Sequence, residues 1–347
     1  GAETMIMNLY REIDRTKIQF DFVCFTHERC DYDDEIEALG GRIFRINSPN
    51  ALMRFFNLVK ILKKGAWEIV HAHTLYSSGL HLLAAKCSGV SKLVAHSHST
   101  NYTKNTTIIG RIYKQGMSWL MSWLPTHYLA CGEAAAEYLF PGRNDVQIIP
   151  NAIDINMFSN AQSSPIREEL CLRSDTLVIL QVGRFIPVKN HFYSVKIAAL
   201  LKKQNLNFKM LFVVNGPGEN EVADLVSKEN LENHVLLLGL RADIPELMAA
   251  ANVMIMPSLY EGFPVVLVES QAASLPAVIA STISHEVDLG LGLVDFIDLE
   301  ESPELWGRKI QAAIKKDKLS ADIHNEILEK KGFSVQAGVK RLMGIYS

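Results

Sequence analysis

The sequence lacks the features that mark secreted, membrane-spanning and nucleic-acid-binding proteins. Its five cysteines are irregularly spaced and form no CxxC pair, which favours free thiols in a reducing compartment over a disulfide framework. Its apolar runs are far shorter than the roughly 20 residues that a membrane-spanning helix needs. The net charge is only -3, so no overall positive charge is available for binding nucleic acid.

What the sequence does contain is an α/β pattern that repeats over two domain lengths. At roughly 150 residues per domain, 347 residues indicate two domains. Apolar, β-rich runs alternate with helical patterns on both sides of a polar stretch at 159–165, which is typical of parallel sheets with helical crossovers. We predict a first domain at 1–158, a second at 159–330 and a C-terminal helix at 331–347 that packs back on the first domain.

The chain opens on a helical pattern, whereas an α/β domain usually opens on a buried strand followed by a glycine-rich turn. We therefore expect a first strand and most of a glycine loop to precede Gly1 in the natural protein. The alternative is a domain that begins with a helix.

Loops that follow strands are the first candidates for ligand binding, because ligands of parallel α/β sheets bind beyond the carboxyl ends of the strands. Two such domains predict a site in the cleft between them. Gly183 to Lys189 follows a predicted strand and precedes a helix, so its Arg184 and Lys189 outline an anion site. The alternative is a solvated loop. The turn with Asn215 and Gly216 is weaker evidence of the same kind.

The segment from Pro257 to Pro276 carries the strongest signal. Glu261 directly precedes a helix that begins near Pro264, and Glu269 lies about two turns into that helix, among valines and alanines. A carboxylate in such an apolar helix is costly unless it is paired, which favours a functional role. Glu261 could instead cap the helix. We expect Gly262 and Phe263 to expose backbone N–H groups beside these carboxylates, which would suit a ligand with many hydroxyls.

Four segments together resemble family 4 of the GT-B glycosyltransferases, a family of retaining enzymes. They are the E-x7-E motif from Glu261 to Glu269, the Gly183–Lys189 loop, the segment Ile148–Phe158 (family pattern PNGID…F) and the opening Gly-Ala-Glu-Thr. The resemblance covers nearly the whole chain, and its nearest likeness is to bacterial enzymes of capsular and exopolysaccharide synthesis. It implies the GT-B fold, in which two Rossmann-like domains face each other across a cleft.

The resemblance also implies which residues act. Arg184 and Lys189 would clamp the diphosphate, Glu269 would hold the ribose hydroxyls, and Glu261 would orient the donor sugar. The full donor set is Gly183, Arg184, Lys189, Asn215, Gly216, Leu240, Arg241, Glu261, Gly262, Phe263, Pro264, Val265 and Glu269. This sequence departs from the family where Pro264 replaces a glycine, where Ala152 replaces the glycine of NGID, and where Val214-Asn215-Gly216 replaces GDG.

Histidines mark the acceptor side of the predicted site. His71 and His73, and likewise His96 and His98, end predicted strands at a spacing of two, so each pair points to one face. His98 matches the position where the family places a histidine near the transferred sugar. The expected catalytic residues are His98, Glu261, Arg184 and Lys189, and the acceptor side comprises Gly1, His73, His96 and His98. A zinc site and a wet polar lining are the alternatives for these histidines. We expect no metal and no cofactor, because no carboxylate or cysteine lies at ligand spacing.

Charge is unevenly distributed along the chain. Between Arg42 and Lys114 there are 11 basic residues and one acidic residue, Glu68. The helical segments at 50–64 and 111–123 combine basic and aromatic side chains, so they could lie against an anionic membrane or a lipid-diphosphate acceptor. The alternative is that Phe55, Leu58, Val59 and Leu62 belong to the core.

The sequence therefore predicts a cytoplasmic glycosyltransferase, which could lie at the inner face of the plasma membrane. It would move a sugar from a nucleotide diphosphate sugar, with UDP favoured, to a saccharide or lipid-linked saccharide, with retention, in polysaccharide synthesis. A sugar-nucleotide epimerase on the same fold and a non-catalytic sugar-nucleotide-binding protein are the alternatives.

Overall fold

The computed structural model describes residues 2–48, 50–99, 107–316 and 321–347, which form two compact units. The first unit is Gly1–Ala152 with Ser334–Ser347, and the second is Ile153–Phe333. The segment 153–158, which the sequence places in the first domain, thus belongs to the second unit, where α7 (Ile155–Ser159) packs against its helices.

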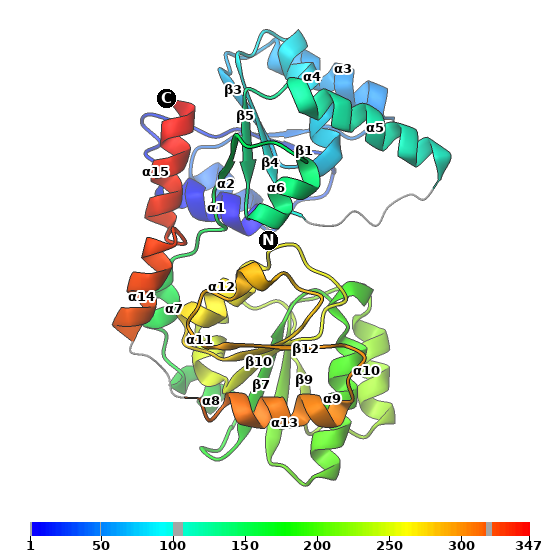
Figure 1. Cartoon of the computed structure of the whole chain (residues 1–347), viewed down its shortest axis with the longest axis vertical. Coiled ribbons are helices and arrows are strands. Elements are labelled where there is room, and N and C mark those ends of the chain that lie inside the picture. Colours follow the sequence, from blue (N-terminus) through cyan, green and yellow to red (C-terminus); the bar gives the residue numbers. More distant parts are fainter. Residues whose placement is uncertain (1, 49, 100–106, 317–320) are drawn as a thin grey trace. The chain divides into compact units, whose positions relative to one another are not determined.

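The first unit is built on a parallel sheet with the strand order β3-β4-β5-β6 (Figure 1). These strands are β3 (Ile69–Ala72), β4 (Lys92–Ser97), β5 (His127–Ala130) and β6 (Val146–Ile148). A separate parallel pair consists of β1 (Phe22–Cys24) and β2 (Ile43–Arg45). The helical elements are α1 (Ala2–Glu12), α2 (Asp33–Ala38), α3 (Ala51–Leu62), η1 (Leu75–Ser77), α4 (Ser78–Cys87), α5 (Ile108–Trp123), α6 (Glu133–Leu139) and α15 (Val335–Tyr346).

Alternation along β4 places helices on both faces of this sheet. Leu93 and Ala95 point into the core formed with α3, α4 and α5. Val94 points to the opposite face and packs with residues of α1 and α15. Because side chains alternate along a strand, His96 shares the face of Val94. The last helix of the chain therefore covers the face of the sheet that carries the histidines.

The second unit holds a six-stranded parallel sheet with the order β12-β11-β10-β7-β8-β9. Its strands are β7 (Leu177–Val182), β8 (Phe208–Val213), β9 (Val235–Leu237), β10 (Val253–Met256), β11 (Ala277–Ala280) and β12 (Val294–Ile297). Besides α7, its helical elements are α8 (Ser164–Glu169), η2 (Pro187–Lys189), α9 (His191–Lys203), α10 (Glu219–Lys228), α11 (Ile244–Ala250), α12 (Val265–Ala272), η3 (His285–Val287), α13 (Pro303–Ala313) and α14 (Ala321–Lys330).

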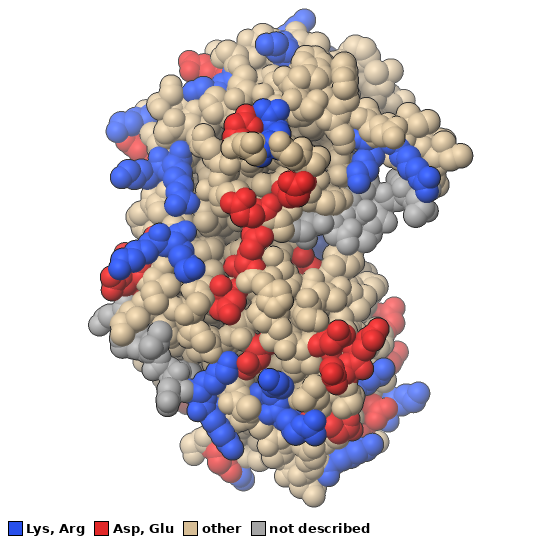
Figure 2. All heavy atoms as spheres, in the orientation of Figure 1, with Lys and Arg blue, Asp and Glu red and all other residues tan. Residues whose placement is uncertain are grey.

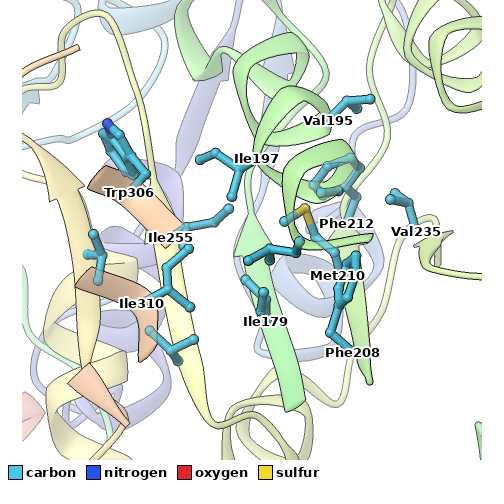
Figure 3. Close-up of a cluster of buried hydrophobic side chains, with 14 of the residues drawn as sticks. Ile179, Val195, Ile197, Phe208, Met210, Phe212, Val235, Ile255, Trp306 and Ile310 are labelled. Atoms are coloured by element: carbon cyan, nitrogen blue, oxygen red, sulfur yellow. The ribbon is translucent and has the colours of Figure 1, made fainter. Parts of the chain in front are cut away.

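The core of the second unit lies between this sheet and its helices (Figure 3). Ile179, Met210 and Ile255 on three neighbouring strands are fully buried, as is Trp306 on α13, which packs against α9. The strands are continuous apolar runs because helices cover both faces of a parallel sheet. The three parallel sheets, with helices between their strands along the chain, confirm the predicted α/β class. No helix among the described residues is both long and apolar enough to cross a membrane.

Candidate active site

The predicted donor residues meet at the carboxyl edge of the six-stranded sheet. They lie on the loops that follow β7, β8, β9 and β10, and β8, β7 and β10 are hydrogen-bonded neighbours. Because all strands are parallel, these loops emerge on the same edge. Residues that are up to 86 positions apart, from Gly183 to Glu269, therefore belong to one region.

The loops after β7 and β8 touch each other through glycine. A Cβ atom on Gly216 would lie 2.3 Å from the backbone nitrogen of Phe185, so no other residue fits there without a shift of the backbone. The N–H of Gly218 donates to the carbonyl of Phe185 at 2.9 Å. Val214, with φ of 89°, occupies a conformation that β-branched residues rarely adopt. The two loops thus form one fixed shelf beside the strand ends.

Lys189 and Glu261 join the loop after β7 to the loop after β10. Lys189 Nζ lies 2.6 Å from Glu261 Oε1, and the two side chains are only 19% and 14% exposed. Two further hydrogen bonds hold the same loops together, from Leu259 N to the Val188 carbonyl and from Asn190 Nδ2 to the Pro257 carbonyl. Sequence reasoning placed Lys189 and Glu261 on the ligand separately and missed this ion pair. Arg184, on the same loop, is exposed.

Glu269 lies on the fifth residue of α12, one turn into the helix and not two as the sequence indicated. Its neighbours Leu267, Val268 and Ser270 are fully buried, and its own side chain is half-buried. Burial raises the pKa of the Glu269 carboxyl to about 7. A carboxyl group with such a pKa, close to loops at the carboxyl edge of a sheet, is a candidate functional group.

The start of α12 presents backbone rather than charge. Pro264 caps the helix in an extended conformation and has no N–H, and Phe263 and Val265 are buried. Gly262 is partly exposed, so the backbone between Glu261 and Phe263 is accessible to a ligand. The accessible part of this helix start is therefore the backbone of Gly262, next to Glu261 in the chain.

Arg241 forms ion pairs that its sequence position does not indicate. Its guanidinium pairs with Glu169 on α8 at 2.6 Å and with Asp243 at 2.6 Å, so two carboxylates already neutralise it. Leu240 is 60% exposed beside it. Asn215 lies close to Gly239, where an added Cβ would come within 3.3 Å of its Oδ1. Arg241 therefore connects the loop after β9 to α8.

In the first unit, the two histidine pairs come together because β3 and β4 are neighbours. The register pairs His71 with Val94 and Ala72 with Ala95, so His73 and His96 follow at the next position. The rings form a grid, with 4.1 Å between the centroids of His71 and His73 and the same distance between those of His96 and His98. Gly1, which the sequence assigned to the same side, lies outside the described residues.

Hydrogen bonds link this grid across the strands. His73 Nδ1 and His98 Nε2 share one at 2.8 Å, and His96 Nδ1 and His71 Nε2 share one at 3.2 Å. Burial lowers the pKa of His71 to about 3 and that of His98 to about 4, so both rings are neutral at physiological pH. A neutral ring offers one donor and one acceptor nitrogen. In His98 the Nε2 atom is bonded to His73, and the Nδ1 atom is buried.

His71, His73 and His96 could also hold a metal ion, since one nitrogen of each lies within 4.8 Å of the others. Two nitrogen–nitrogen contacts, His73 with His98 and His96 with His71, have hydrogen-bond length, however. Each such bond occupies the lone pair of one ring nitrogen, and a lone pair of this kind is what binds a metal. The absence of a metal stays a prediction.

Two residues of these regions carried no signal in the sequence. Tyr346 on α15 reaches the grid, where its hydroxyl lies 2.5 Å from His71 Nδ1. His191 at the start of α9 is buried, and its ring centroid lies 4.4 Å from that of Phe185. Burial lowers the pKa of His191 to about 4. The positions of Tyr346 and His191 depend on tertiary contacts, which the periodicity of a sequence does not predict.

Comparison with known proteins identifies the family. The model of the group 1 glycosyl transferases matches residues 162–329, and the model of glycosyltransferase family 4 matches residues 1–157. The chain is 38% identical to the putative glycosyltransferase EpsF of Bacillus subtilis, over all of this chain and 93% of that protein.

Two further relatives have more specific names. One is the UDP-Gal:alpha-D-GlcNAc-diphosphoundecaprenol alpha-1,3-galactosyltransferase of Escherichia coli, 31% identical over 65% of this chain and 60% of that protein. The other is the capsular polysaccharide biosynthesis glycosyltransferase CapH of Staphylococcus aureus, 25% identical over 100% of this chain and 95% of that protein.

Among solved structures, Anabaena HepE in complex with UDP-glucose superposes with a TM-score of 0.79 at 21% identity, over 99% of this chain and 95% of that one. Such a likeness establishes the fold. The chain belongs to glycosyltransferase family 4 and has the two-domain GT-B fold.

Proposed function

We propose that this glycosyltransferase moves a sugar from a UDP-sugar to a saccharide acceptor on a lipid diphosphate, with retention, during synthesis of a cell-surface polysaccharide. The observation that carries the donor half is the placement of Lys189 and Glu261 on adjacent loops at one sheet edge, with Glu269 in the helix that follows Glu261. A UDP donor is supported by the names of the galactosyltransferase relative and of the HepE complex. The galactosyltransferase name also supports the lipid-linked acceptor, and CapH supports the polysaccharide product.

Each donor residue has a role that its chemistry supports. Glu269, when ionised, accepts hydrogen bonds from the two ribose hydroxyls. Lys189 and the exposed Arg184 contact the diphosphate and offset the charge that develops on it as the bond to the sugar breaks. Glu261 keeps Lys189 in place and accepts from hydroxyls of the donor sugar. The donor backbone contacts come from Gly183, Gly216, Gly262 and Phe263.

In the proposed reaction, the acceptor hydroxyl oxygen attacks the anomeric carbon from the face that the diphosphate leaves. The bond from that carbon to the phosphate oxygen breaks, and the acceptor proton passes to the departing phosphate oxygen. The products are UDP and a glycoside with the same anomeric configuration as the donor. Neutral His98 hydrogen-bonds to the transferred sugar. His73 fixes the orientation of His98 through their shared hydrogen bond.

The proposal includes no metal, because Lys189 and Arg184 supply the positive charge that a divalent ion would supply at the diphosphate. Turnover should therefore survive treatment with a chelator. Elemental analysis of the purified protein should find less than about a tenth of an equivalent of zinc. An equivalent of zinc that the His71→Ala substitution removes would contradict this part of the proposal.

The experiment that tests the function has two stages. Thermal shift with UDP, GDP and ADP identifies the base, and a panel of the matching nucleotide sugars is then assayed with a lipid-diphosphate saccharide. We expect stabilisation by UDP and turnover of one UDP-sugar, with the product's anomeric configuration read by NMR. Interconversion of the donor sugar without an acceptor would favour an epimerase. Binding of UDP without turnover of any donor would favour a non-catalytic binding protein.

A further inference from the structure

The helical layer of the first unit has an exposed apolar surface on its outer side. α3 and α5 both pack against α4, and their inward residues belong to one core. α5 buries Leu120 and Met121 inward. Ile112, Trp119 and Trp123, on its other side, are between 52% and 63% exposed. α5 therefore carries apolar side chains on both faces. Among the described residues, the core covers one face and the other is exposed to solvent.

The exposed residues of α5 follow helical spacing. Ile108, Ile112, Trp119 and Trp123 stand at i, i+4, i+11 and i+15, which places them in one stripe along the helix. The rings of Trp119 and Trp123 contact each other at 5.2 Å. A scattered surface tryptophan needs no explanation, but a continuous stripe of this kind indicates an interaction surface.

α3 presents a second exposed stripe that changes from apolar to basic. Leu52 and Phe56 are each 60% exposed, and Lys60, Lys63 and Lys64 continue the same side toward the helix end. Leu58 and Leu62 are buried, and Phe55 and Val59 pack against the same core. These four residues therefore belong to the core, which was the alternative to membrane contact. The alternative does not hold for Leu52 and Phe56, which contribute nothing to the core.

Charge around this layer has one sign. The sequence holds no Asp or Glu between Glu68 and Glu133, a span that includes α4 and α5, and α3 has none either. Where α5 lies in Figure 1, Figure 2 shows basic side chains and no acidic ones. An anionic surface could therefore approach the layer without meeting a like charge.

A hollow of about 350 Å³ lies at the basic end of α3. Lys60 and Lys64 line it together with Arg45 and His27. Arg45 is paired with Asp33, so the two lysines are the cations in the hollow that carry no ion pair among the described residues. Its size and charge suit a phosphate-bearing headgroup next to the apolar residues of the same helix.

We propose that this α3–α5 surface docks on an anionic phospholipid bilayer. The surface is defined by Leu52, Phe56, Lys60, Lys63, Lys64, Arg111, Ile112, Trp119 and Trp123. Tryptophan and lysine suit the interface of a bilayer, because indole rings settle at the headgroup level and lysine stems lie along apolar surface while the amino group stays in water. The exclusive positive charge favours a bilayer over a second copy of this chain, whose matching surface would repel it. The benefit to the enzyme, access to a lipid-linked acceptor, rests on the proposed function, but the docking itself does not.

Flotation of the full chain with phosphatidylglycerol–phosphatidylcholine vesicles, at low and at high salt, tests the proposal. Wild type should float with anionic vesicles at low salt, with at least a fivefold loss at high salt, and should not float with pure phosphatidylcholine. Trp119→Ser/Trp123→Ser and, separately, Lys60→Glu/Lys63→Glu/Lys64→Glu should each lower the floated fraction at least fivefold.

Matched controls change similar residues on the second unit. Phe192→Ser/Ile323→Ser removes exposed apolar side chains, and Lys228→Glu/Lys315→Glu/Lys331→Glu reverses three exposed lysines. Both controls should float like wild type. Circular dichroism and stabilisation by UDP show that every variant is folded. Because flotation needs no turnover, its result is separate from that of the donor assay.

Three results would overturn the proposal. One is failure of wild type to float with anionic vesicles at low salt. Another is flotation that the controls lower as much as the surface variants do. The third is self-association in analytical ultracentrifugation that Trp119→Ser/Trp123→Ser abolishes, without flotation of wild type, since the surface would then bind a second copy.

Discussion

Lys189 and Glu261 form an ion pair of 2.6 Å that joins the loops after β7 and β10. Both side chains are mostly buried, so each charge depends on the other. The lysine is thereby held in position at the sheet edge before a diphosphate arrives. Such prior placement of charge is how enzymes stabilise a leaving group without rearrangement during the reaction.

The first prediction concerns this pair. Lys189→Ala should lower kcat/KM at least tenfold, or about 1.4 kcal/mol, because it removes positive charge from the leaving diphosphate and leaves Glu261 unneutralised. Glu261→Gln should lower it by a similar factor. The double variant should lose less than the product of the two single losses, because the residues act as a unit. Steady-state kinetics with the identified UDP-sugar measures all three.

The control for the pair is a surface ion pair of the same unit, Arg173 with Asp175, both well exposed. Arg173→Ala and Asp175→Ala should leave kcat/KM within twofold of wild type. Strict additivity at Lys189 and Glu261 would mean that the ion pair has no part in catalysis.

The second prediction concerns pH and Glu269. Its pKa of about 7 lies above the ordinary carboxyl value, so the folded state holds a proton that the unfolded state releases between pH 4.5 and 7. The ionised form is the one that accepts from two ribose hydroxyls. UDP should therefore bind more tightly as pH rises from about 6 to about 8, while the contribution of this group to stability falls as pH rises from 4.5 to 7.

Glu269→Gln separates these two effects. It should weaken UDP binding at pH 8 at least tenfold and should raise the free energy of unfolding at that pH by on the order of 1–3 kcal/mol, because the uncharged amide avoids the cost of burying a carboxylate. Isothermal titration and denaturant unfolding at pH 6 and pH 8 measure both. A UDP affinity of wild type that does not change between these pH values would refute the assignment.

The third prediction concerns the histidine grid. The pKa values of His71 and His98, about 3 and about 4, lie below the ordinary value of 6.5. The unfolded state therefore binds more protons between pH 6.5 and 4, and stability should fall as pH drops through that window. Each tenfold difference in proton affinity between the unfolded and folded states contributes at most about 1.4 kcal/mol to this fall. Denaturant unfolding between pH 4 and 8 measures the slope, and His71→Gln should flatten it.

His98→Ala should lower kcat at least tenfold and leave UDP affinity within twofold, because His98 belongs to the first unit and the proposed nucleotide site to the second. His73→Ala should lower kcat less, and His73→Gln should recover part of that loss by restoring a hydrogen bond to His98. Loss of UDP affinity in His98→Ala would contradict this division of roles.

The fourth prediction concerns the contact between the loops after β7 and β8. Gly216→Ala should destabilise the protein by more than about 1 kcal/mol and abolish stabilisation by UDP, because its Cβ would lie 2.3 Å from Phe185 N. Gly344→Ala on α15, where an added Cβ meets nothing within 4 Å, is the matched control and should be neutral or slightly stabilising. Thermal unfolding with and without UDP distinguishes the two variants. Equal thermal stability and equal stabilisation by UDP in both variants would contradict a structural role for the contact between these loops.

Much of the fold could be predicted because it is encoded locally. Apolar β-rich runs and helical patterns identified β7, β8 and α9 within a few residues, and the polar stretch at 159–165 placed the division close to Ala152–Ile153. The donor residues could be predicted because they follow strands, and parallel strands end at one edge.

The remaining features depend on which elements become neighbours. The pairing of β3 with β4 turns two separate HxH motifs into one grid, and the return of α15 brings Tyr346 to His71. The partners of Arg241 on α8 and of Lys189 on the loop after β10 are likewise tertiary. No pattern within a single segment encodes such contacts, which is why the sequence did not indicate these two ion pairs.

The central claim is that a UDP-sugar binds at this sheet edge through Glu261 and Glu269 and is consumed there. The most direct measurement is turnover of the UDP-sugar with a lipid-diphosphate saccharide by wild type, Glu269→Ala and Glu261→Ala, with Glu232→Ala, an exposed carboxylate of the same unit, as control. We expect Glu269→Ala and Glu261→Ala each to lower turnover at least tenfold, about 1.4 kcal/mol, and Glu232→Ala to leave it unchanged. Activity of both site variants within twofold of wild type would contradict the central claim.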